Sequence, residues 1–495
     1  MSSIGSFVKG LRNTMWKDPG TSSDLQRLPQ LSWLLFLKVY DEREAFWELD
    51  DESYSSLIPE PCRWRCWAHD NKDGKSLTGD SLTEFVNSEL LPTLKHLPVT
   101  SFTPVRQRIV PLMFSDVENY MKDGVLLRQV INTIDEIDFE DYQEQHAFNE
   151  IYESILKNMQ GSKATGEFYT PRAVTDFVVE MVHPQIGEKV ADFACGTGGF
   201  LVSALKALES KMASADDAVL LQSSLFGTEW KALPFQLCMT NLLLHGLDSP
   251  NLINGDSLSK DVRSYGDADT FDVIVMNPPY GGNTARNTLL KFPADLRTSE
   301  TAFLFVVLIL YRLKSKGRVG IVVSDGFMQS AAGSEAAIKE KLLSECNLHT
   351  IIRLPGSVFS PYTSIATNLL FFDKTGKTKE TWFYRLDMPE GYKHFSKTKP
   401  ILSEHFDEVR AWWSDRREVA DEREDDSAPV SYKAKRYSFD ELKAANFSLD
   451  FCGFPHESET VLPPDELLAE YHAKKAAHDK RIDEILGNLM DVLKR

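Results

Sequence analysis

The sequence predicts three parts: a helical N-terminal domain, a doubly wound α/β domain and a helical C-terminal tail. In the middle of the chain, short apolar runs that end in Gly, Asp or Pro alternate with helix-length segments, which is typical of βαβ units and a mostly parallel sheet. On both sides of this region, apolar residues recur at helical spacing instead. The predicted boundaries are residues 1–155, 156–425 and 426–495.

The N-terminal part is predicted to be helical because its apolar residues lie within charged, helix-forming stretches. The stretch at 30–49, QLSWLLFLKVYDEREAFWEL, passes from an apolar run into a charged continuation. Similar helical patterns occur at 121–137 and 147–159. Between them, PCRWRCWAHDNKDG is expected to be an ordered loop with aromatic anchors.

The central part contains seven candidate strands. They are KVADFA, SLFGTE, PNLINGD, FDVIVMNPP, RVGIVVSDG, LHTIIRLP and TNLLFFDK. In a doubly wound sheet, ligands bind outside the carboxyl ends of the strands. The residues that follow these runs are therefore the first candidates for chemistry.

The C-terminal tail carries an apolar stripe that needs a partner. Residues spaced by three and four positions along one helix face form it: Ile482, Ile485, Leu486, Leu489, Met490 and Leu493. Packing on the chain's own body and packing on another subunit are both consistent with this stripe.

The charge distribution limits what the chain can bind alone. Of the net charge of −18, residues 1–160 carry −10, residues 161–400 carry zero and residues 401–495 carry −8. Such a surface repels polyanions, so a chain of this kind that acts on DNA needs another polypeptide to supply positive charge. The six scattered cysteines predict a reduced, cytoplasmic protein, and the longest apolar run, Ala302–Tyr311, is too short to span a membrane.

A glycine-rich turn follows the first candidate strand and opens a helix. It contains Asp192, Gly196, Thr197, Gly198 and Gly199. Glycines let a ligand approach the backbone, and a helix start offers free N–H groups. The spacing departs from the G-x-G-x-x-G dinucleotide fingerprint, which disfavours a nicotinamide enzyme.

Two acidic residues follow the next two strands. Glu229 is placed to accept hydrogen bonds from a ribose diol, and Asp256 to receive the amino group of an adenine. For either residue alone, a helix cap is the better explanation, but such features after three consecutive strands favour a ligand site. A ligand with an amino-acid end near the glycines, a ribose at Glu229 and an adenine at Asp256 has the parts of S-adenosylmethionine.

The most specific element is Asn277-Pro278-Pro279-Tyr280, directly after the apolar strand FDVIVM. Two prolines stiffen the turn, so the Asn277 side-chain carbonyl and the Pro278 backbone carbonyl can converge on one amino group. Accepting both amino hydrogens stabilises the positive charge that develops on the nitrogen during attack on a methyl donor. Tyr280 offers a face for stacking a planar base.

Together, GEFYTPR, FACGTGGF and NPPY resemble the motifs of DNA amino-methyltransferases of the adenine-N6 group. More closely, the chain resembles the modification subunit of Type I restriction–modification systems. This resemblance implies a methyltransferase variant of the doubly wound sheet with a reversed last strand. It also implies S-adenosylmethionine contacts at the cofactor residues, which are Glu167, Phe168, Tyr169, Thr170, Pro171, Arg172, Asp192, Gly196, Thr197, Gly198, Gly199, Glu229 and Asp256.

The resemblance further implies that the turn at residues 277–280 holds an adenine flipped out of double-stranded DNA. Two such subunits usually join one specificity subunit, and a restriction subunit can join them; no metal is expected. Methylation of a glutamine side chain or an RNA base is the alternative reaction. A non-catalytic scaffold with the methyltransferase fold is the alternative without chemistry.

Overall fold

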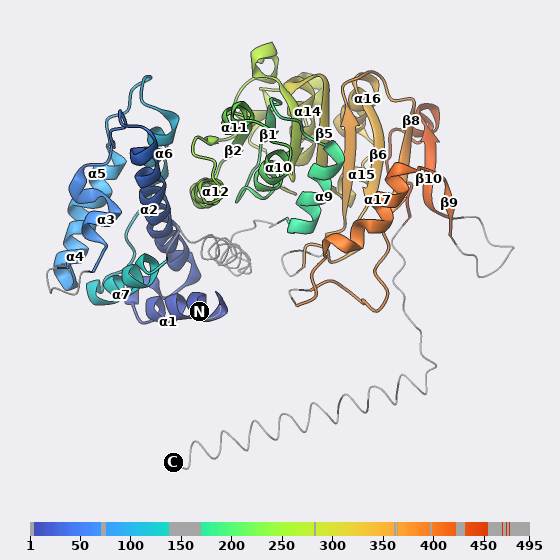
Figure 1. Cartoon of the computed structure of the whole chain (residues 1–495). Helices are drawn as coiled ribbons and strands as arrows, with labels where there is room; N and C mark the ends of the chain where they lie inside the picture. The colour runs from blue at the N-terminus through green and yellow to red at the C-terminus, as the bar shows by residue number, and fades with distance from the viewer. Residues whose placement is uncertain are drawn as a thin grey trace. The chain divides into compact units, whose positions relative to one another are not determined.

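The computed structural model describes residues 4–70, 76–137, 170–281, 284–360, 363, 365–396, 398–421 and 431–453, together with Leu468, His472 and Lys475. The chain divides into two compact units, Met1–Asp387 with His394–Pro455, and Met388–Lys393 with His456–Arg495. The first unit holds the helices and strands from α1 to α18 (Figure 1). The helices predicted at 147–159 and 482–493 lie outside the described residues.

The N-terminal region is helical, as predicted. Residues 4–70 and 76–137 contain no strand and form α1 (Ile4–Trp16), α2 (Asp24–Asp50), α3 (Trp64–Trp67), α4 (Gly79–Phe85), α5 (Leu91–Lys95), α6 (Val105–Phe114) and α7 (Gly124–Asp135). The predicted aromatic loop includes the short helix α3, and both Trp64 and Trp67 are buried anchors. The Trp64 indole N–H donates to Asp135 at 2.8 Å, which fastens this segment to α7.

The central domain is built on a ten-stranded sheet with the order β3-β2-β1-β4-β5-β7-β6-β8-β10-β9. All seven predicted strands are present: β1 (Val190–Asp192), β2 (Leu225–Glu229), β3 (Asn251–Asn254), β4 (Phe271–Met276), β5 (Leu313–Ser324), β6 (Asn347–Arg353) and β7 (Thr367–Asp373). Strands β1 to β5 pair in parallel, whereas β7 runs antiparallel between β5 and β6. The reversed strand implied by the family resemblance is therefore confirmed.

Helices precede, separate and follow these strands, in the alternation that the sequence pattern predicts. They are α9 (Arg172–Val182), α10 (Gly199–Glu209), α11 (Ala215–Gln222), α12 (Ala232–Leu244), α13 (Arg286–Leu289), α14 (Thr301–Arg312), α15 (Asp325–Gln329), α16 (Gly333–Glu345), α17 (Asp407–Ser414) and α18 (Phe439–Ala444). The described helices include none that is both long and apolar enough to cross a membrane.

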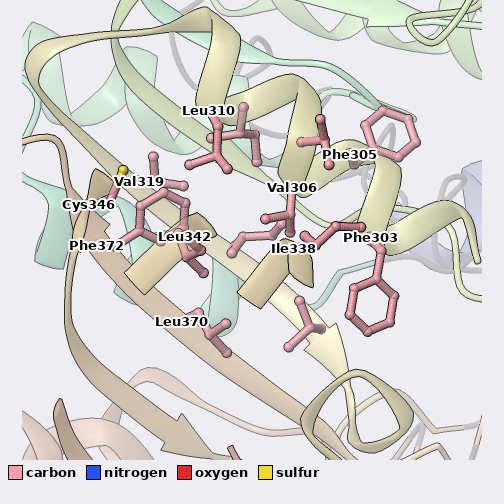
Figure 2. Close-up of a cluster of buried hydrophobic side chains, with 14 of the residues drawn as sticks. Phe303, Phe305, Val306, Leu310, Val319, Ile338, Leu342, Cys346, Leu370 and Phe372 are labelled. Carbon is pink, nitrogen blue, oxygen red and sulfur yellow. The ribbon is translucent and has the colours of Figure 1, made fainter. Parts of the chain in front are cut away.

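Strand β5 is apolar on both faces because both faces are covered. Val319, Ile321 and Val323 belong to the core cluster that also includes α14 and α16; part of this cluster is drawn in Figure 2. On the other face, a Cβ at Gly320 would lie 2.5 Å from a methyl carbon of Val178 on α9. Glycine at this position therefore lets α9 pack closely against the sheet.

The sheet extends further than the sequence pattern indicated. Strands β8 (Glu380–Arg385), β9 (Val419–Ala420) and β10 (Tyr432–Ser438) add to it beyond β6. The region predicted as a helical tail from residue 426 thus contains a strand, which is a correction to that expectation. Charged and apolar residues alternate in YKAKRYS, and antiparallel pairing with β8 buries Ala434.

A buried arginine joins the ends of three elements. Arg353, at the end of β6, is 1% exposed and donates to Asn368 at 3.1 Å, to Asp450 at 2.7 Å and to the Gly453 carbonyl at 2.6 Å. Asp325, at the start of α15, lies 3.3 Å from the same guanidinium group. The network ties the segment after α18 to the sheet.

We expect Arg353→Met to lower the free energy of unfolding by about 3–5 kcal/mol, because it removes a buried charge whose loss leaves the partly buried Asp325 and Asp450 without their counter-charge and the buried Asn368 carbonyl without its donor. Chemical denaturation of the purified chain measures this loss. Arg436→Met is the control: Arg436 pairs with Glu380 at the surface, so the cost should stay below about 1 kcal/mol. Equal losses in the two variants would contradict the structural role of Arg353.

Candidate active site

Three strand ends carrying predicted site residues meet at one edge of the sheet. β1 lies between β2 and β4 and is parallel to both, with Ala191 opposite Phe226 on one side and Ile274 on the other. Parallel strands in register end on the same side. The glycine turn after β1, Glu229 at the end of β2 and Asn277 after β4 are therefore neighbours at this edge.

The glycine turn has the backbone geometry that its sequence predicts. Gly196 has a φ of 53° and Gly198 a φ of 83°, in the left-handed region that favours glycine. A Cβ at Gly198 would lie 2.8 Å from the sulfur of Cys238, whereas a Cβ at Gly196 would meet no atom within 4 Å. Gly198 thus permits close packing beneath the turn, and the open space at Gly196 is the kind of cradle a ligand requires.

Glu229 is tied directly to the glycine turn. Its carboxylate accepts the Gly196 N–H at 2.9 Å through one oxygen and the Lys231 N–H at 2.8 Å through the other. A carboxylate oxygen can accept more than one hydrogen bond, so Glu229 can also accept from a ligand hydroxyl. The structure therefore brings together two residues that the sequence separates by 33 positions.

Asp192 lies beneath the turn and is 1% exposed. Burial raises the pKa of its carboxyl to about 8, the Ala194 N–H that it accepts at 3.0 Å opposes this rise, and the nearby charge of Glu229 adds to it. The carboxyl is thus mainly protonated at neutral pH. A neutral acid at this depth avoids the cost of a buried charge beside the carboxylate of Glu229.

Asp256 lies two residues beyond the end of β3 and is exposed. Its carboxylate accepts the Leu258 N–H at 2.9 Å within a turn, and no helix begins at these described residues, so Asp256 is not the helix cap that the sequence left open as an alternative. The Gly255 N–H donates to the Glu229 carbonyl at 2.9 Å, so this loop is joined to the end of β2. Asp256 therefore lies near Glu229 and keeps a solvent-facing side.

The Asn-Pro-Pro-Tyr turn follows β4. Its side chains form a hydrogen-bonded network with Thr170. The Asn277 amide N–H donates to the Thr170 hydroxyl at 3.0 Å, and the Tyr280 hydroxyl donates to the Asn277 side-chain carbonyl. Burial raises the pKa of the Tyr280 phenol, so it stays protonated and can donate. The Asn277 side-chain carbonyl, which was predicted to accept a hydrogen bond from the target amine, therefore already accepts one from Tyr280.

The structure describes part of the segment at 167–172, for which the family resemblance implies contacts with the cofactor. Glu167, Phe168 and Tyr169 lie outside the described residues, whereas Thr170, Pro171 and Arg172 lead into α9. The Arg172 guanidinium donates to the Gly199 carbonyl at 2.8 Å. The described residues thus join the Asn-Pro-Pro-Tyr turn, through Thr170, to the glycine turn, through Arg172.

Helix α12 supports the glycine turn through two residues that were not among the predicted site residues. The Asn241 amide N–H donates to the Thr197 carbonyl at 2.9 Å, and the Cys238 sulfur lies beneath Gly198. Both are almost fully buried. A single Asn in the apolar helix ALPFQLCMTNLLL was the available signal, because a buried amide requires a partner.

A cavity of about 170 Å³ lies away from this edge. It is lined by Met181, Val182, Lys316, Arg318, Val319, His349, Phe371, Phe372, Asp373 and Thr375. These residues include none of the predicted site residues, and they surround the start of β6 and the end of β7. Arg318 is held by Glu188 at 2.6 Å, so its charge is already matched there.

Family models match both parts of the chain. The N-6 DNA Methylase family matches residues 143–460, and the HsdM N-terminal domain matches residues 4–134. The chain belongs to the N-6 DNA methylase family. The assignment agrees with the sequence resemblance and with the reversed strand β7.

Relatives of this N-6 DNA methylase include methylase subunits of Type I restriction enzymes. The EcoEI methylase subunit of Escherichia coli is 45% identical over 494 residues, which cover 99% of this chain and 98% of that protein. The EcoKI methylase subunit of E. coli K12 is 27% identical over 76% of this chain and 70% of its own length. The chain is therefore a member of the Type I methylase subunit family.

Solved structures confirm the fold of this methylase. A crystal structure of a Type I modification subunit from Vibrio vulnificus YJ016 has a TM-score of 0.78 at 41% identity, covering 89% of this chain and 92% of that one. A structure described in terms of complex assembly in a type I restriction–modification system has a TM-score of 0.78 at 32% identity and covers 99% of both chains.

We expect Asp192→Asn to reduce the loss of stability that accompanies rising pH. Because folding raises the pKa of Asp192 from 3.8 to about 8, its stabilising contribution is complete below pH 3.8 and is lost as the pH rises to about 8. Asparagine resembles the protonated acid and does not titrate. Unfolding free energies of both proteins at pH 5, 6.5 and 8 measure the difference.

Asp217→Asn is the control for this experiment. Backbone and side-chain hydrogen bonds lower the pKa of the exposed Asp217, so its contribution is lost only as the pH falls below 3.8. That variant should follow the wild-type pH dependence between pH 5 and 8. If Asp192→Asn also follows it, the carboxyl of Asp192 is not protonated in the folded protein.

Proposed function

We propose that this protein transfers a methyl group from S-adenosylmethionine to the N6 atom of an adenine flipped out of double-stranded DNA, as the modification subunit of a Type I restriction–modification complex. The main support is the stiff Asn-Pro-Pro-Tyr turn at the same sheet edge as the glycine turn. Family membership supports the reaction class and the donor. The reduced cysteines favour the cytoplasm as the location.

The cofactor residues suit the parts of S-adenosylmethionine. The open space at Gly196 and the free N–H groups at the start of α10 suit the amino-acid end, Glu229 suits the ribose, and Asp256 suits the adenine amino group. When bound, S-adenosylmethionine supplies a methyl group activated by a sulfonium. The protein then has to align the target nitrogen with that methyl group.

The catalytic turn acts on the target amine. The Asn277 side-chain carbonyl and the Pro278 backbone carbonyl accept its two hydrogens, which favours a pyramidal nitrogen and stabilises the developing positive charge. The adenine amine takes the place of the Tyr280 hydroxyl as the donor to Asn277. The freed Tyr280 ring then stacks on the base, a contact worth about 1–3 kcal/mol.

The net negative charge of the chain indicates what its partners have to supply. A chain with net charge −18 cannot neutralise many phosphates, so a specificity subunit supplies sequence reading and much of the backbone contact. By the family pattern we infer two copies of this chain for each specificity subunit, an assembly that a restriction subunit can join. The stripe at residues 482–493 is the candidate segment for subunit association.

We expect Asn277→Ala to lower methyl transfer to DNA at least about 100-fold while leaving S-adenosylmethionine binding largely intact, because only the acceptor for the target amine is lost. Labelled S-adenosylmethionine and plasmid DNA, with the chain bound to its specificity subunit, provide the assay. Asn287→Ala, on the exposed surface of α13, is the control and should retain full activity.

The same assay separates the alternatives. Label on protein or RNA instead of DNA would identify a glutamine or RNA methyltransferase. No label on any acceptor, with wild-type protein and saturating donor, would support a scaffold. An unchanged rate in Asn277→Ala would show that the turn is not the catalytic centre.

The isolated chain should bind DNA weakly at physiological salt, and the specificity subunit should strengthen binding by at least about 100-fold, since the chain alone repels phosphates. Titration of fluorescent duplex DNA at 50 and 200 mM salt measures both affinities. Tight, sequence-specific binding by the isolated chain would contradict the assignment of sequence reading to the partner.

A further inference from the structure

The start of α9 joins the two turns of the candidate active site. Thr170 accepts a hydrogen bond from the Asn277 amide at 3.0 Å, and Arg172 donates to the Gly199 carbonyl at 2.8 Å. The family resemblance implied cofactor contacts for both residues. In the structure, the side chain of each residue makes a hydrogen bond to one of the two turns of the protein itself.

The two ends of the Asn277 carboxamide are chemically different. Only its carbonyl oxygen can accept a hydrogen from an amine, whereas its N–H₂ group can only donate. Rotation of the amide by half a turn would present two donors to the target amine, which is repulsive. Catalysis therefore requires one of the two orientations.

In the productive orientation, the amide N–H₂ points away from the target and needs an acceptor of its own. Thr170 supplies that acceptor, and the Tyr280 hydroxyl on the other end of the amide marks where a donor approaches the carbonyl. Without Thr170, a half-buried donor would lose its partner and the amide would lose the contact that opposes its rotation.

Both ends of this contact rest on stiff backbone. Thr170 immediately precedes Pro171, whose carbonyl accepts the first-turn N–H groups of Val174 and Thr175. Buried residues of α9, including Phe177, pack against the sheet. Asn277 stands before two prolines. A side-chain hydrogen bond between two rigid elements can fix an orientation that a contact between mobile loops cannot.

We propose that Thr170 is a positioning residue for catalysis: its hydroxyl holds the Asn277 carboxamide with the carbonyl facing the amine to be methylated. This inference rests on the proposed function. It assigns to Thr170 a role in orienting the catalytic turn in place of a contact with the cofactor.

The test compares Thr170→Val, which keeps the shape but removes the hydroxyl, with Thr170→Ser, which keeps the hydroxyl. In the complex with the specificity subunit, Thr170→Val should lower kcat for DNA methylation by about 10- to 100-fold, because the amide donor is left unmatched. The KM for S-adenosylmethionine and its Kd should change less than about threefold. Thr170→Ser should recover most of the activity.

Other results would overturn the proposal in identifiable ways. A raised Kd for S-adenosylmethionine with unchanged kcat in Thr170→Val would make Thr170 a cofactor contact. Equal losses in the Val and Ser variants would indicate packing alone. Full activity in Thr170→Val, with an active wild type, would refute the positioning role, whereas an inactive wild type would refute the proposed function.

A second background tests whether Thr170 acts through Asn277. Asn277→Asp replaces the amide by a carboxylate, which accepts hydrogen bonds at both ends and has no wrong orientation. In that background, adding Thr170→Val should cost less than about threefold. The same large loss in both backgrounds would show that Thr170 acts elsewhere.

Discussion

The parallel pairing of β1 with β2 and β4 is the constraint on which the site depends. The glycine turn, Glu229 and Asn277 follow three separate strands, and only parallel alignment places their strand ends at one edge. The Gly196 N–H to Glu229 contact then joins two of these ends directly. A shift in register of any strand would separate groups that are each ordinary in isolation.

Stiffness is the second property that these contacts share. The two prolines restrict the backbone of the Asn-Pro-Pro-Tyr turn, and close packing at Gly320 holds α9, which begins two residues after Thr170, against the sheet. Helix α12 supports the glycine turn through Asn241. Methyl transfer from an activated donor depends chiefly on alignment. A site built on short contacts between rigid elements is therefore appropriate to the proposed reaction.

The charge distribution along the chain supports the proposed division of work within a complex. Residues 161–400 contain most of the sheet and are neutral overall, whereas the flanking segments carry all of the net negative charge. Such a chain can perform chemistry on a base while relying on a partner for phosphate contact.

The sequence alone determined the seven strands, the helical N-terminal region and the residues of the two turns, because these are encoded by local patterns: alternating apolar runs, helical spacing, glycines and paired prolines. Three features were decided only in the tertiary structure. Strands β8 to β10 depend on long-range pairing. The hydrogen bonds of Thr170 and Tyr280 to the Asn277 carboxamide join residues up to 107 positions apart. The neutral state of Asp192 results from burial. Each depends on which groups folding brings together and removes from water, and a local pattern does not contain that information.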